Sequence, residues 1–198
     1  MPQPFARIRY GAIKIPIPNV QQMDDYTCGA AAFQAVCCYF GVGPSDADDY
    51  VKILKSDPKN GTRPEEIVNW ARKFGLVAEC VENMSDAELK RHLDAGRPVI
   101  CSMQAYGKTP KRIEQYKAKK NGHYLDLDGH YIVAIGYDNE NFFFEDPSMA
   151  GRRGFISIAE FGHRWHEDDS GHKIRLGIVI AGPDDGEPAC LREAVYIP

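Results

Sequence analysis

The sequence lacks a long apolar run. Its apolar stretches, such as residues 179–181, are far shorter than the roughly 20 residues that a membrane-spanning helix needs. An excess of positive charge is also missing, since 24 Lys and Arg stand against 28 Asp and Glu and the net charge is −4. Proteins that bind nucleic acid generally use basic side chains to neutralise phosphates. We therefore expect neither a membrane protein nor a nucleic-acid partner.

Signals for secretion and for metal binding are missing too. Residues 1–7 contain no apolar segment of the kind found in secretory signals, which favours a cytoplasmic location. The cysteines do not form a Cys-x-x-Cys pair, so a zinc site or a redox motif has no support. We expect no metal and no cofactor. The surroundings of four cysteines are apolar and predict buried thiols, namely Cys37, Cys38, Cys80 and Cys101.

What is present is typical of one soluble domain spanning residues 1–198. Apolar residues make up 43% of the chain and charged residues 26%, enough for a core and a solvated surface. Residues 1–20 should be extended, with an edge strand, because the prolines at 16 and 18 disfavour a helix.

Start and stop signals predict helices mainly in the first half of the chain. A buried helix should run from Cys28 to Phe40 and end at Gly41. The other predicted helices each start at a capping residue: about 45–55 capped by Ser45, 62–75 opened by a capping box at Thr62, 85–96 opened by a capping box at Ser85, and 157–165 capped by Ser157.

Strands are predicted mainly in the second half, where β-branched and aromatic residues gather. A turn at residues 138–141 should make two of these strands antiparallel neighbours. Helices followed mostly by strands indicate an α+β fold, in which N-terminal helices pack on a C-terminal antiparallel sheet. The predicted strands are 76–81, 98–103, 131–137, 141–145 and 174–180.

A basic insertion loop is predicted at residues 105–129. Within it, residues 108–120 carry six basic side chains against one acid, Glu114, and 112–120 could form a short helix. Such a long loop in a compact domain is either solvated and mobile or functional, as a lid or a contact for an acidic partner. Both interpretations stay open.

Cys28 stands where a polar loop turns into the buried helix, six residues after Gln22. The thiolate is the nucleophilic form of cysteine, and a helix N-terminus lowers the pKa of a thiol. A glutamine just upstream can donate an N–H to a developing oxyanion. This short segment is therefore a candidate for covalent catalysis. Gln22 is preferred to Gln21 because of the resemblance described below, in which the glutamine stands six residues before the cysteine.

A cysteine nucleophile needs a base, and a histidine is the usual choice. His130 opens an apolar strand and is thus held on a rigid element beside open space. The hairpin that follows should return Asp146 close to His130, while strand alternation turns Glu145 to the opposite face. We therefore expect Asp146 to orient the imidazole. The remaining histidines lie in polar stretches: His92, His123, His163, His166 and His172.

Taken one at a time these residues are commonplace; together and in this order they resemble the C39 and C39-like peptidases of the papain-like cysteine peptidase superfamily. The resemblance implies a papain-like fold, with Cys28 as nucleophile, His130 as base, Asp146 as orienting group, and the Gln22 side chain with the Cys28 N–H as oxyanion hole. Thr27 stands where an aspartate commonly precedes the cysteine in this family. The matching residues are Gln22, Cys28-Gly29-Ala30-Ala31, Tyr39-Phe40-Gly41, residues 96–100, residues 129–137 and residues 144–148.

The hypothesis from the sequence is a cysteine peptidase that acts on a peptide or protein, and one form of this hypothesis is the processing of a leader or precursor peptide. Two alternatives keep the same residues: an acyltransferase or amidase that uses the same thioester chemistry, and a catalytically silent peptide-binding module.

Overall fold

A six-stranded sheet forms the centre of the fold, with strand order β1-β8-β2-β5-β6-β7 and every pairing antiparallel. The computed structural model describes residues 11–105, 119–120, 123–124, 129–166 and 175–183. The strands are β1 (Val77–Val81), β2 (Val99–Gln104), β5 (Gly129–Tyr137), β6 (Asn141–Glu145), β7 (Arg153–Ser157) and β8 (Gly177–Ala181). The predicted α+β fold is confirmed.

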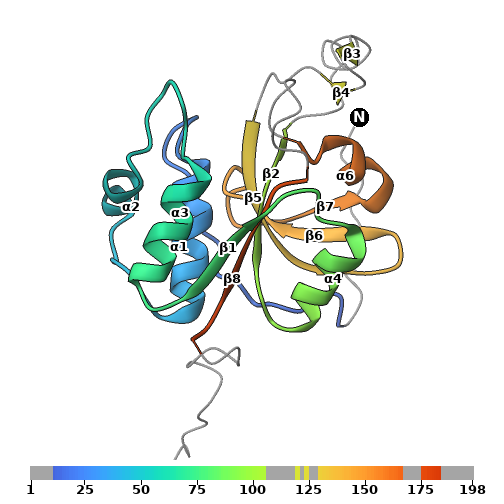
Figure 1. The fold of residues 1–198 in the computed structure, drawn as a ribbon, viewed down its shortest axis with the longest axis horizontal. Coiled ribbons are helices and arrows are strands. Elements are labelled where there is room, and N and C mark those ends of the chain that lie inside the picture. Colours follow the sequence, from blue (N-terminus) through green and yellow to red (C-terminus); the bar gives the residue numbers. More distant parts are fainter. Residues whose placement is uncertain (1–10, 106–118, 121–122, 125–128, 167–174, 184–198) are drawn as a thin grey trace, which may run out of the picture.

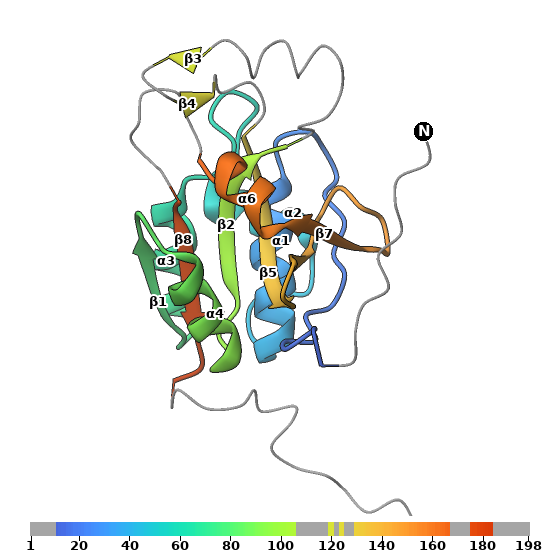
Figure 2. The same cartoon turned by 90° about the vertical axis from the view of Figure 1, so that its right-hand side faces the viewer.

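Helices cover both faces of this sheet (Figure 1). The helices α1, α2 and α3 lie on one side of the sheet, while α4 and α6 lie on the other. In Figure 2, α4 and α6 lie in front of the sheet and α1 lies behind it. The helices are α1 (Cys28–Phe40), α2 (Ala47–Leu54), α3 (Pro64–Lys73), α4 (Asp86–Asp94) and α6 (Ile158–Arg164). Within the described residues, none of the helices has the length and apolarity to cross a membrane.

Helix α1 has the bounds that the sequence predicts. All of its residues except Cys38 are buried, because the helix packs against β5 of the sheet and against α2. Gly41 ends it in the left-handed conformation at φ 70°, where a residue without Cβ is favoured. The thiol of Cys38 is therefore exposed, and the prediction that it is buried is wrong.

Two predicted helix caps are also wrong. Helix α2 is capped by Asp46 rather than Ser45, since the Asp46 carboxylate accepts from the Asp48 N–H at 2.9 Å. Thr62 does not cap α3, because its hydroxyl is hydrogen-bonded to that of Ser56 at 2.6 Å, and Pro64 itself starts the helix. The capping box at Ser85 of α4 is confirmed.

The strands agree with the predictions to within a few residues, except that β7 was not predicted. Residues 11–20 do not form the predicted edge strand: they make an isolated bridge from Ile13 to Gly136, and the prolines interrupt further pairing. Figure 2 shows this segment, in blue, running beside the sheet towards the start of α1. Residues 1–10 lie outside the described part of the chain.

Most of the basic insertion also lies outside the described residues. Its described parts are two short strands, β3 (Lys119–Lys120) and β4 (His123–Tyr124), which pair with each other. The predicted helix over residues 112–120 is therefore wrong at Lys119 and Lys120, which form β3. Cys80 is exposed because β1 lies at the edge of the sheet, whereas Cys37 and Cys101 are buried as predicted.

Candidate active site

Cys28 is the first residue of α1 and is buried, with 6% of its surface exposed. The first N–H groups of a helix have no partner within the helix, and Thr27 provides no side-chain cap for them. The first turn also contains no acidic side chain. This helix terminus is therefore left free to stabilise negative charge at the sulfur or on a group that the sulfur attacks.

The loop before Cys28 is braced by Thr27. The Thr27 hydroxyl accepts from the N–H groups of Met23 and Asp24 at 3.1 and 3.0 Å and donates to the Asp24 carbonyl at 3.0 Å. The same carbonyl accepts from the Gln22 side-chain amide at 2.9 Å. This bond occupies one of the two amide protons of Gln22, so the second is available as a donor. Thr27 therefore fixes the conformation of the loop between Gln22 and Cys28.

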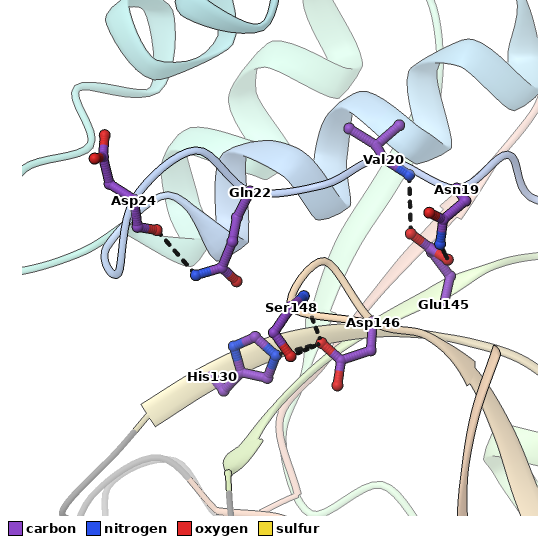
Figure 3. A network of polar contacts seen from close by, with 8 residues as sticks. All are labelled: Asn19, Val20, Gln22, Asp24, His130, Glu145, Asp146 and Ser148. Carbon is purple, nitrogen blue, oxygen red and sulfur yellow. Dashed lines mark hydrogen bonds and ion pairs between the residues drawn. The ribbon is translucent and has the colours of Figure 1, made fainter. Parts of the chain in front are cut away.

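His130 and Asp146 meet as the hairpin predicts. Nε2 of His130 lies 2.7 Å from Oδ1 of Asp146 (Figure 3). The Cys28 side chain also interacts with this imidazole, and the interaction favours the charged form of His130. Cys28, His130 and Asp146, which come from α1, β5 and the residue after β6, therefore lie together.

The charge state of the pair follows from these contacts. Burial alone would lower the pKa of His130, but the hydrogen bonds to Asp146 and Cys28 and the charges on both partners raise it to about 9. Burial would raise the pKa of Asp146, yet its hydrogen bonds to His130 and Ser148 keep it lowered. At neutral pH the arrangement favours an imidazolium beside a carboxylate.

Ser148 is a residue of the site that the sequence analysis missed. Its N–H and its hydroxyl both donate to Oδ1 of Asp146, at 2.9 and 2.8 Å. Such a turn, in which an aspartate accepts from the residue two positions later, could have been expected from the sequence Asp146-Pro147-Ser148. It fixes the carboxylate oxygen that the imidazole contacts.

Glu145 faces away from His130, as strand alternation predicts. Its buried carboxylate accepts from the Asn19 side chain at 2.7 Å, the Val20 N–H at 3.0 Å and the Arg153 guanidinium at 2.6 Å. The contacts with Asn19 and Val20 were not predicted, because residues 126 and 125 positions apart in the chain carry no local signal of their contact.

The glutamine loop and the Asp146 turn are neighbours. The N–H of Gln22 donates to the carbonyl of Pro147 at 3.0 Å, and the Gln22 side chain extends in the direction of His130 (Figure 3). Gln21, in contrast, is exposed, which agrees with the preference for Gln22. The predicted site residues Gln22, Cys28, His130 and Asp146 therefore lie together. They surround the start of α1, the first residues of β5 and the end of β6. Among the residues that the structure describes, no cluster of His, Cys, Asp and Glu could hold a metal ion.

Comparison with known proteins identifies the family of the chain. The profile of the peptidase C39-like family matches residues 14–170, which include each of the site residues. The chain belongs to this family. A search of curated proteins gave no match for the C39-like chain.

Solved structures show the same fold. A putative C39-like peptidase from Bacillus anthracis matches with a TM-score of 0.63 at 18% identity, over 86% of this chain and 96% of that one. The peptidase domain of Streptococcus ComA, a bifunctional ABC transporter involved in quorum sensing, matches at 0.58 and 23% identity, over 82% and 96%. A double-glycine motif protease of an AMS/PCAT transporter, in complex with its leader peptide, matches at 0.59 and 16%, over 86% and 94%. The C39-like chain therefore has the papain-like peptidase fold.

Proposed function

We propose that this member of the C39-like family is a cysteine peptidase that hydrolyses peptide bonds through Cys28, His130 and Asp146. The observation that carries the proposal is the position of the His130 imidazole, 2.7 Å from the Asp146 carboxylate and in interaction with the Cys28 side chain at the start of α1. Nucleophile, base and orienting group are the parts that acyl transfer by a thiol requires.

In the proposed reaction the Cys28 thiolate attacks the peptide carbonyl carbon, and a carbon–sulfur bond forms as the carbonyl oxygen becomes an oxyanion. The Cys28 N–H and the second amide proton of Gln22 stabilise that oxyanion, where one donor is typically worth roughly 100-fold or more in rate. The imidazolium of His130 then gives its proton to the leaving amine. Water, deprotonated by His130, hydrolyses the thioester and releases the acid product.

A peptide is the proposed substrate class. The similar double-glycine motif protease was solved with a leader peptide, which supports a peptide ligand for this fold. A contact between the basic insertion and an acidic partner stays a prediction, because most of that segment lies outside the described residues.

Alkylation tests the nucleophile directly. Iodoacetamide should label Cys28 faster than Cys37, Cys38 and Cys101 near neutral pH. Burial raises the pKa of the Cys37 thiol to about 12, and desolvation also raises the pKa of Cys38 and Cys101. A His130→Ala variant should slow the labelling of Cys28 by roughly 10-fold or more, because an unassisted thiol is only a few per cent ionised at pH 7.

The matched control is His163→Ala, which removes an exposed histidine of α6 and should leave the labelling of Cys28 unchanged. Cleavage of a peptide library should disappear in Cys28→Ala, and products formed with an added amine distinguish hydrolysis from acyl transfer. Labelling of Cys28 no faster than the other thiols, or cleavage that survives Cys28→Ala, contradicts the proposal.

A further inference from the structure

The buried carboxylate of Glu145 lies next to Asp146 in the chain but takes no part in the contacts of His130. Burying a carboxylate is costly unless its oxygens are hydrogen-bonded. Here Oε1 accepts from the Val20 N–H, while Oε2 accepts from the Asn19 amide and from Arg153. Two of these three donors belong to the segment that leads into the glutamine loop.

The segment from Ile17 to Gln22, which we call the glutamine strap, is hydrogen-bonded at one end to β7 and at the other to the turn between β6 and β7. At one end the Arg153 guanidinium donates to the Ile17 carbonyl, and at the other the Gln22 N–H donates to the Pro147 carbonyl at 3.0 Å. Between them, Asn19 uses both ends of its amide, since its oxygen accepts from the Gly151 N–H at 2.7 Å. Figure 3 shows Glu145 holding Asn19 and Val20 on one side while Gln22 reaches towards His130 on the other.

The dipeptide Glu145–Asp146 thus points its two carboxylates at two different parts of the site. Asp146 fixes the imidazole, and Glu145 fixes the strap that carries Gln22. Because Gln22 is only two residues beyond Val20, a shift of the Val20 backbone moves the Gln22 amide with it. A donor misplaced by about 1 Å can cost on the order of 100-fold in rate.

From these contacts we propose that Glu145 is a positioning residue for the oxyanion donor Gln22. The proposal rests on the proposed function of Gln22 and Cys28. Glu145 stabilises the transition state of acylation through the strap, and it leaves the ionisation of the Cys28–His130 pair unchanged. Reactions at Cys28 that form an oxyanion should therefore depend on Glu145, and reactions that form none should not.

Two reagents separate these cases without a known peptide substrate. p-Nitrophenyl acetate acylates Cys28: a carbon–sulfur bond forms, p-nitrophenolate leaves, and the carbonyl oxygen passes through an oxyanion. Iodoacetamide alkylates the same thiolate by displacement of iodide and forms no oxyanion. In Glu145→Gln, acylation of Cys28 should fall by roughly 10-fold or more, as expected for a displaced donor, while alkylation stays unchanged.

The decisive comparison is made in a Gln22→Ala background. Once the donor is gone, Glu145→Gln should cause no further loss of acylation, because residues that act as one unit are not additive. Asn19→Ala serves as a second variant: Asn19 is exposed, so its loss should spare the fold and reproduce the effect more weakly. The matched control is Asp86→Asn, which alters another carboxylate–arginine pair, that with Arg175 at 2.8 Å, and should change neither rate.

Each outcome has one meaning. Equal losses of acylation and alkylation, or a Glu145→Gln effect that persists in full without Gln22, would show that Glu145 only maintains the fold or the Cys28–His130 pair. Unchanged acylation in Glu145→Gln and Asn19→Ala would also overturn the proposal. Wild-type protein in which Cys28 is acylated no faster than its other thiols would refute the proposed function itself, and the positioning role with it.

Discussion

His130 interacts with two groups that favour its charged form, the Asp146 carboxylate at Nε2 and the Cys28 side chain. These contacts outweigh the burial of the ring, which by itself favours the neutral form. A single imidazole therefore carries both the proton that the proposed reaction needs and a part of the folding stability. The two consequences are linked through its pKa.

The stability that His130 contributes should depend on pH with a defined sign. Its pKa rises from 6.5 in the unfolded chain to about 9 in the folded one, so its contribution is fully present below pH 6.5 and is lost as pH rises towards 9. The difference in free energy of unfolding between wild type and His130→Asn should therefore be larger at pH 6.5 than at pH 9.5, as measured by denaturant titration. A difference that stays flat or grows with pH would contradict the raised pKa of His130.

At the scale of the element, helix α1 combines a buried body with an open N-terminus. Its bounds follow from the sequence because apolar residues run from Cys28 to Phe40 and Gly41 provides the left-handed stop. What the sequence does not reveal is the packing at its first turn. Gly29 lies so close to Thr62 that a Cβ at position 29 would be 2.6 Å from the Cβ of Thr62 and 3.0 Å from the Tyr131 ring.

Gly29→Ala should therefore destabilise the protein although alanine is the better helix former. Thr62 is buried and hydrogen-bonded to Ser56, so it has little room to yield, and overpacking of this kind costs about 1–3 kcal/mol. Thermal unfolding measures the loss. Gly162→Ala in α6 is the control, because among the described residues its Cβ would meet only the far end of the Arg175 side chain. Equal stability of the two variants would argue against a tight contact at Thr62.

At the scale of the whole molecule, the segment before α1 contacts β5, the strand that carries His130, and then leads to Gln22 and Cys28. Ile135 is an extra residue in β5, at a bulge between Ala134 and Gly136, and its carbonyl accepts from the N–H groups of Lys14 and Ile15 at 2.9 and 3.0 Å. From this bulge the chain continues past Glu145 to Gln22 and then into α1. The bulge thus sets where the glutamine strap begins, and the site depends on a contact far from the chemistry.

Gly136→Ala tests this docking. A Cβ at position 136 would lie 2.0 Å from the backbone oxygen of Ala12, which cannot move unless the whole segment moves. The free energy of unfolding should fall by about 1–3 kcal/mol, as measured in urea. Gly129→Ala, in the same strand, should have little effect, because no described atom lies within 4 Å of its Cβ position. An unaffected Gly136→Ala protein would mean that the segment is not fixed at the bulge.

The sequence by itself determined the five helices, five of the six strands of the sheet, and the candidate residues Gln22, Cys28, His130 and Asp146. The bounds of α1, the hairpin of β5 and β6, and the opposite directions of Glu145 and Asp146 are local consequences of apolar periodicity, turn residues and strand alternation. It failed where local signals compete, as at Ser45 and Asp46, which can both cap a helix.

Only the tertiary structure decided how the parts meet. The insertion of β8 between β1 and β2, the contact of Gly29 with Thr62, and the clamp of Glu145 on the glutamine strap each join segments that are distant in the chain. Their free energy comes from burial and hydrogen bonds that exist only once the sheet has formed. No residue pattern within either partner encodes such a contact, which is why the strap had to be found in the folded chain.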